Sequence, residues 1–159
     1  MSEPLGIYLK DHLGGAQVAV HLLEAMGNQN DEEKYREFAK RLLLDIQSDD
    51  DTLRKILGSI AEEPSHIKNA GGWLLETLAR LKLGHTRSVG LDMFESLEIL
   101  SLGIMGKRSL WRALAVVSKD DIRLGEYDFD TLLHRAEEQF ELVEQERLGL
   151  AQQVFVLQD

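Results

Sequence analysis

The stretch AKRLLLDIQSDDDTLRKILGSI, residues 39–60, shows the periodicity from which the fold can be predicted. Apolar side chains recur at alternating spacings of three and four residues, the pattern of an α-helix with one buried face. The seam consists of Ala39, Leu42, Ile46, Asp49, Leu53, Ile56 and Ile60. The run Ser48 to Asp51 could interrupt this helix, because aspartate is a poor interior residue and a good cap. Since the spacing continues in phase through that run, we predict one helix, straight or bent.

The rest of the chain divides into segments with the same periodicity. The expected helices are residues 4–26, 31–62, 64–84, 90–117 and 128–157. Pro4 and Pro64 fall at helix starts, where proline is tolerated, and we expect the charged linker 118–128 to be only loosely ordered. No hairpin turn and no sustained alternation predicts a strand. Amphipathic helices with short connections predict an all-α fold, an antiparallel up-and-down bundle of four to five helices in a single domain, 1–159.

The segment 90–117 is apolar nearly all round its helical wheel. Its large apolar side chains include Leu91, Met93, Phe94, Leu97, Leu100, Leu102, Ile104, Trp111 and Leu114, which cannot share one stripe. Such a helix is central in its bundle or covered by a partner chain. We therefore expect a homodimer or a protein partner that contacts an apolar helix face. Gly103 and Gly106 in this helix predict a close helix–helix approach or a local kink.

The composition excludes several classes of function. The chain has 159 residues, 28 acidic and 18 basic side chains, and a formal net charge of −10. This acidity argues against nucleic acid or an anionic membrane as partner, because each needs a concentrated basic surface. The absence of cysteine removes disulfides, zinc–thiolate sites and thiol nucleophiles. No secretory signal is recognisable, and no run approaches the roughly 18 apolar residues of a membrane helix. We expect a cytoplasmic protein.

Polar residues on the apolar seams are the candidates for chemistry, since sites in helical bundles are built from inward-facing side chains. His12, Asp49 and Arg147 lie on seams, and Glu98 lies one turn from apolar neighbours on either side. Antiparallel pairing places His12 level with Asp45 and Asp49. The same construction places Glu98 level with Arg147. These matched heights along the bundle predict two ion pairs, one between His12 and Asp45 or Asp49 and one between Glu98 and Arg147.

Two interpretations of these residues remain open. In the first, they form buried ion pairs that fix helix register and add little net stability. In the second, they hold iron, manganese or zinc in a site like that of ferritin. The ligands would then be His12, Asp45, Asp49, Glu95 and Glu98. Such sites use paired Glu-x-x-His motifs, whereas this chain has one, at residues 63–66, across a helix start. Arg147 would also bring a competing positive charge close to Glu98.

No serine or threonine has a base placed beside it, so we predict no catalytic residue and no organic cofactor, and whether the chain is an enzyme stays open. We expect a non-catalytic interaction or structural role. One alternative is a ferritin-like metal protein with redox or oxygen-related chemistry. Another is a bundle that binds a ligand, which would contain a lined apolar cavity.

Two stretches resemble a family of uncharacterised bacterial helical-bundle proteins. The run YLKDHLGGA, residues 8–16, is similar to the opening helix of that family, and LEILSLGIMGK, residues 97–107, with LWRAL, residues 110–114, resembles a later part of it. The resemblance implies an all-helical fold, loosely ferritin-like in outline, over most of the chain. It implies no activity. The matching polar positions are Asp11, His12, Glu98 and Lys107.

Overall fold

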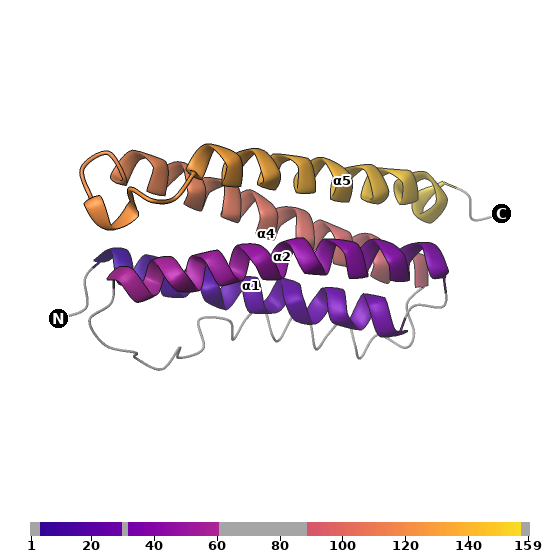
Figure 1. Ribbon diagram of the computed structural model, residues 1–159. Coiled ribbons are helices and arrows are strands. Elements are labelled where there is room, and N and C mark those ends of the chain that lie inside the picture. Colours follow the sequence, from indigo (N-terminus) through magenta and orange to yellow (C-terminus); the bar gives the residue numbers. More distant parts are fainter. Residues whose placement is uncertain (1–3, 30–31, 61–88, 157–159) are drawn as a thin grey trace.

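The computed structural model describes residues 4–29, 32–60 and 89–156, in which four long helices pack together (Figure 1). The elements are α1 (Pro4–Gln29), α2 (Glu33–Ile60), α4 (Val89–Val117), the short 3₁₀ helix η1 (Ile122–Leu124) and α5 (Phe129–Phe155). These described ranges contain no strand. The prediction of an all-α helical bundle is therefore confirmed.

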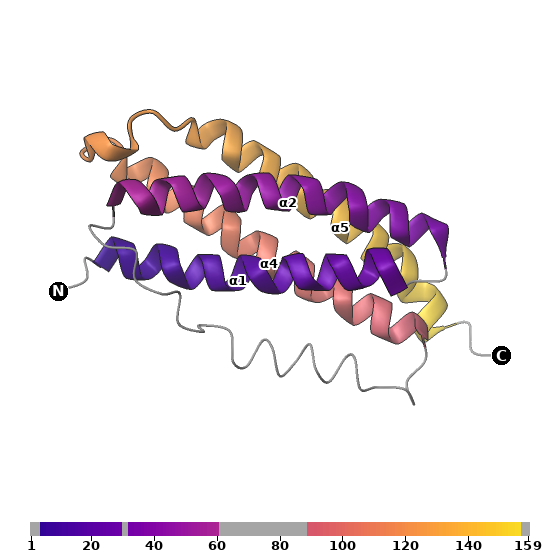
Figure 2. The same ribbon diagram turned by 60° about the horizontal axis from the view of Figure 1, so that its bottom comes forward.

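The helices form two antiparallel pairs, α1 with α2 and α4 with α5, and the second pair crosses the first obliquely (Figure 2). Within the described helices, α2 and α4 run in the same direction. The predicted helix 64–84 lies outside the described residues. The alternation of an up-and-down bundle can therefore be followed only within each pair.

Helix α2 continues without a break through the acidic run, as the unbroken spacing predicts. Asp49 and Asp50 are both buried, whereas Asp51 is exposed. Arg54, one turn further on, donates through Nε to Asp50 Oδ2 at 2.8 Å. The acidic residues thus find cationic partners instead of capping a new helix, and the helix persists.

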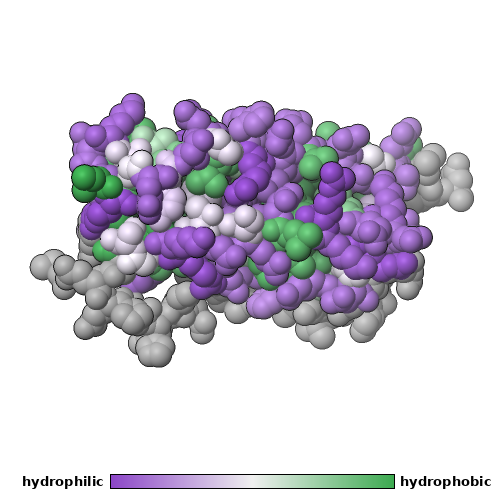
Figure 3. Space-filling model, in the orientation of Figure 1, coloured by the Kyte–Doolittle hydropathy of each residue, from purple (hydrophilic) through white to green (hydrophobic). Residues whose placement is uncertain are grey.

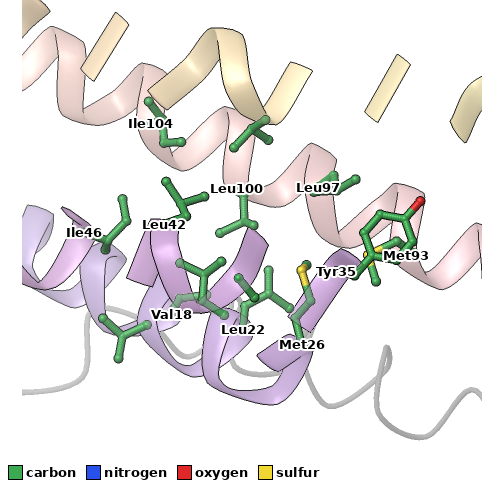
Figure 4. Close-up of a cluster of buried hydrophobic side chains, with 14 of the residues drawn as sticks. Val18, Leu22, Met26, Tyr35, Leu42, Ile46, Met93, Leu97, Leu100 and Ile104 are labelled. Atoms are coloured by element: carbon green, nitrogen blue, oxygen red, sulfur yellow. The ribbon is translucent and has the colours of Figure 1, made fainter. Parts of the chain in front are cut away.

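The hydrophobic core consists of two clusters, one at each end of the bundle. Figure 4 shows one of them, in which side chains of α1 and α2, such as Leu22 and Leu42, point toward Leu97 and Leu100 of α4. The other cluster surrounds Trp111, which is 1% exposed. Because the core is in two parts, polar side chains can occupy the middle of the bundle between the two clusters.

The linker between α4 and α5 is ordered, contrary to our expectation. Asp121 accepts a hydrogen bond from the backbone N–H of Arg123 at 3.1 Å, and Asp128 accepts one from the backbone N–H of Thr131 at 3.0 Å. These carboxylates cap η1 and α5. Leu124 is 0% exposed and packs with the cluster at the end of α2. Buried Leu124, which lies between the two capping residues, thus anchors the linker. The sequence did not predict this order, because a helix of three residues shows no hydrophobic periodicity.

The surface is mixed. The face shown in Figure 3 is mostly hydrophilic, with hydrophobic side chains in small separate groups. None of the helices in the described ranges combines the length and the apolar character needed to cross a membrane. Helix α4 buries one side and exposes Leu102, Met105 and Val116 on another. The packing of the described helices therefore covers only part of its apolar surface.

Candidate functional site

A layer of polar side chains separates the two hydrophobic clusters in the middle of the bundle. We call it the polar layer; it consists of Asp49 (α2), Lys107 (α4), Arg135 and Gln139 (α5). For Asp49, Lys107 and Gln139, the buried residue about one turn before and the one about one turn after belong to different clusters. Each helix thus changes from one cluster to the other at its polar residue.

The carboxylate of Asp49 is the centre of this layer and is 3% exposed. Lys107 donates from Nζ to Asp49 Oδ2 at 2.5 Å, and Gln139 donates from Nε2 to the same oxygen at 3.2 Å. Arg135 donates from Nη2 to Oδ1. A buried carboxylate is stable only when paired and hydrogen-bonded. Asp49 meets both conditions through partners on two other helices.

Lys107 connects Asp49 to Gln139. Its ammonium donates to Asp49 Oδ2 and to Gln139 Oε1, which uses two of its three N–H groups. Burial lowers the pKa of Lys107, and the neighbouring charge of Asp49 opposes this shift. Lys107 is thus largely desolvated, and its third N–H has no acceptor among the described residues.

A cavity of about 380 Å³ opens between α1, α2 and α4 beside the polar layer. Most of its wall is apolar, from Ala16, Ala19, Ile46, Leu53, Ile104, Leu110 and Trp111. Its polar residues are Tyr8, Asp11, His12, Asp49, Asp50 and Lys107. The cavity therefore combines an apolar chamber with a charged group that the bundle itself holds in place.

Three glycines make room for this cavity. Gly15 of α1 and Gly103 and Gly106 of α4 line it, and a Cβ atom built at any of them would meet no heavy atom within 4 Å. The sequence predicted that the two glycines of α4 allow a close helix approach or a kink. The close approach is wrong, because open space lies where the neighbouring helix would have to be.

Two buried polar atoms of cavity-lining residues have no hydrogen-bond partner among the described residues. They are Oδ1 of Asp50 and Nε1 of Trp111. The other oxygen of Asp50 accepts from Arg54 Nε and, at 3.4 Å, from Gln17 Nε2. An unsatisfied buried polar atom costs about 1–3 kcal/mol. Both atoms are fully buried, so an occupant could reach them only if neighbouring side chains move.

His12 lines the cavity from α1 and is half-buried. Its ring meets the ring of Tyr8 edge-on, with 4.6 Å between centroids. Burial lowers the pKa of His12, with the charge of Asp11 opposing this shift. The imidazole is therefore neutral at pH 7 and offers one N–H donor and one acceptor. His12 and Asp49 line the same cavity, as their predicted heights require, but Asp49 pairs with Lys107 and Arg135.

The predicted metal ligands do not come together. Asp45 and Glu98 are exposed, Glu95 is partly exposed, and Asp49 is held by the polar layer. Across the described ranges, no three His, Asp or Glu side chains are grouped so that they could hold a metal ion. The structure thus gives the five residues His12, Asp45, Asp49, Glu95 and Glu98 no common site for iron, manganese or zinc.

The second predicted charge pair exists but is not buried. Arg147 donates from Nη1 to Glu98 Oε2 at 3.4 Å, as the matched heights predict, but the Glu98 side chain is 53% exposed. Arg147 is held more closely by Glu144, at 2.7 Å, and lies over the ring of Phe94. An exposed pair of this kind contributes little to stability.

Sequence reasoning missed Lys107, Gln139 and Arg135 as partners of Asp49. Gln139 lies three residues after Ala136 and four before Val143, both fully buried, so it falls on the seam of α5. That polar seam position was a readable signal. Arg135 has no such signal, because its long side chain reaches the carboxylate from beside the seam.

Comparison with protein-family models, with curated protein sequences and with solved structures gave no significant match. The fold and the site therefore define the class on their own: a helical bundle with a buried polar layer and an adjoining apolar cavity.

Proposed function

We propose that this protein is a non-catalytic binding module that takes a small apolar molecule into the cavity between α1, α2 and α4. The observation that supports the proposal is the cavity itself, about 380 Å³ in volume, with mostly apolar walls and few polar groups. Small-molecule sites have this size and character, and between the helices of a bundle is one of their usual places. A lined cavity is also the feature that distinguishes a ligand-binding bundle from one that is only structural.

The hydrogen bonds within the polar layer favour a binding function over a catalytic one. The Asp49 carboxylate already accepts from Lys107, Arg135 and Gln139, so proton transfer by it would have to break a buried network. Groups held by such a network have fixed positions, which favours orientation of a ligand.

Binding of octan-1-ol, a neutral apolar probe, tests this proposal. Saturation-transfer NMR is expected to show contact between the octyl chain and the wild-type protein. Gly106→Leu would place a side chain in the cavity, where the Cβ has free space, and should weaken binding at least about tenfold, which corresponds to about 1.4 kcal/mol.

The matched control is Gly58→Leu, on the exposed side of α2 and outside the cavity, where a Cβ also meets no neighbour. It should bind octan-1-ol as the wild type does. No saturation transfer at millimolar probe, or equal binding by both leucine variants, would contradict the proposal.

We also propose that the protein forms a homodimer through α4. Support comes from Leu102, Met105 and Val116, which are exposed and lie on one side of this helix. Light scattering between about 10 and 500 µM should show a dimer, and the double variant Leu102→Glu, Met105→Glu should be monomeric. A monomeric wild type over that range would refute this proposal.

A further inference from the structure

The polar layer contains more basic than acidic side chains. Lys107 and Arg135 both pair with the single carboxylate of Asp49. Burial and the charge of Arg135 lower the pKa of Lys107, so a second anion beside Lys107 Nζ would stabilise its charged form. The Arg135 side chain is 33% exposed and does not line the cavity, whereas Lys107 is 15% exposed and lines it, so Lys107 is the basic group that an occupant of the cavity would meet. The nearby carboxylates of Asp11 and Asp45 are exposed, and solvent therefore reduces their effect on the cluster.

The cavity side of α4 also has donors to spare. Lys107 uses two of its three N–H groups within the polar layer. Trp111, one turn further along the helix, has a buried indole N–H without an acceptor among the described residues, and residues four apart lie on one face of a helix. Of these two donors, Lys107 is the one with accessible surface, because its side chain is 15% exposed whereas the Nε1 atom of Trp111 is fully buried.

Asp50 gives the opposing argument, because its unpartnered Oδ1 could accept from a cationic ligand. However, the Arg54 guanidinium lies 2.8 Å from the other oxygen of Asp50 and balances its single charge. Lys107, by contrast, shares the carboxylate of Asp49 with Arg135. At the Lys107 side of the cavity an anionic ligand is therefore favoured over a cationic one.

We infer that the cavity binds an apolar monocarboxylate, whose chain lies along Leu53, Ile104 and Leu110 and whose carboxylate accepts a hydrogen bond from Lys107. The inference rests on the proposed function, since it names the chemical class of the ligand for the same cavity. A carboxylate supplies an acceptor for the third N–H of Lys107 and a negative charge that stabilises the ammonium. The apolar wall accommodates its hydrocarbon chain.

Four probes with the same hydrocarbon chain test the inference: octanoate, octanamide, octan-1-ol and octylammonium. Titration calorimetry of the wild-type protein at pH 7 should show octanoate binding at least about tenfold more tightly than octanamide or octan-1-ol, a difference of about 1.4 kcal/mol. Octylammonium should bind most weakly. The comparison with octanamide removes the charge and keeps a carbonyl acceptor, so it needs no protein variant.

The outcomes separate the two proposals. If none of the probes binds, the proposed function fails. If octan-1-ol or octanamide binds as tightly as octanoate, or octylammonium binds more tightly, the cavity remains an apolar site and the monocarboxylate inference is overturned.

A protein variant tests the role assigned to Lys107. Lys107→Met should abolish the advantage of octanoate over octan-1-ol, whereas Lys107→Arg should keep an octanoate preference. Retention of the full preference in Lys107→Met would overturn the assignment of Lys107. If Lys107→Met does not fold, the wild-type comparison of octanoate with octanamide decides the inference.

Discussion

Asp49 shows how one residue connects the helices of this bundle. Its position on the seam of α2 could be predicted from the spacing of apolar residues, and its burial is confirmed. Its partners could not be predicted from that spacing, because they come from α4 and α5 and depend on how the two helix pairs cross. Sequence periodicity gives the face on which a residue lies, whereas contacts between distant segments depend on tertiary packing.

Asp49→Asn should destabilise the protein strongly. The substitution leaves Lys107 and Arg135 without a carboxylate in a buried setting, and breaking a buried ion pair from one side costs about 3–5 kcal/mol. Asp45→Asn is the matched control, since Asp45 lies one turn earlier on α2 and is exposed; its effect should stay within about 0.5 kcal/mol. Urea denaturation at pH 7 measures both, and similar stability of the two variants would contradict the role of Asp49.

His12 should make stability depend on pH. Burial lowers its pKa in the folded protein below the ordinary value of 6.5. Between the two values the unfolded chain binds more protons than the folded one, so the free energy of unfolding rises with pH through this window and is constant above it. Acidification below 6.5 should therefore destabilise the wild type more than His12→Gln.

Imidazole NMR gives the direct measurement of this pKa. The signal that disappears in His12→Gln identifies the ring, and its titration midpoint should lie below 6.5. A midpoint at or above 6.5, or identical pH dependence of stability in the two proteins, would show that burial does not control this group.

At the scale of the elements, the sequence predicted the long helices well and the linker poorly. Helix α2 was expected at 31–62 and spans Glu33–Ile60, because a seam repeated over about six turns leaves little freedom in phase or length. η1 has only three residues and gives no periodic signal. The carboxylates of Asp121, which caps η1, and Asp128, which caps α5, were the available evidence for order in the linker.

Leu124 should account for the order of this linker. Leu124→Ala removes a side chain that is 0% exposed, and a large-to-small change at such a position costs about 2–5 kcal/mol. Ile122→Ala, in the same three-residue helix, changes a residue that is 95% exposed and should alter stability by less than about 0.5 kcal/mol. Thermal unfolding of the two variants compares them. Equal melting temperatures would mean that the linker does not anchor the start of α5.

At the scale of the whole molecule, the polar layer lies where a continuous hydrophobic core would be the simpler arrangement. The two clusters on either side could merge if Asp49, Lys107 and Gln139 were apolar. Buried ionic groups usually add little net stability. We therefore explain the polar layer by its placement of Lys107 beside the cavity, and not by a contribution to the stability of the fold.

An apolar replacement of the layer separates these two explanations. In the triple variant Asp49→Leu, Lys107→Met, Gln139→Met, Arg135 can turn its partly exposed side chain toward solvent, and no buried charge is left unpaired. We expect the free energy of unfolding to be unchanged or higher by about 1–4 kcal/mol, as for other buried ion pairs replaced by apolar residues, in contrast to the loss in Asp49→Asn.

The same variant should lose the preference for octanoate over octan-1-ol, because the cation at the cavity wall is gone. Urea denaturation and titration calorimetry on one protein sample measure both properties. Greater stability with lost carboxylate preference would show that the layer exists for binding at a cost in stability. A triple variant as unstable as Asp49→Asn would instead show that the layer holds the two halves of the core together.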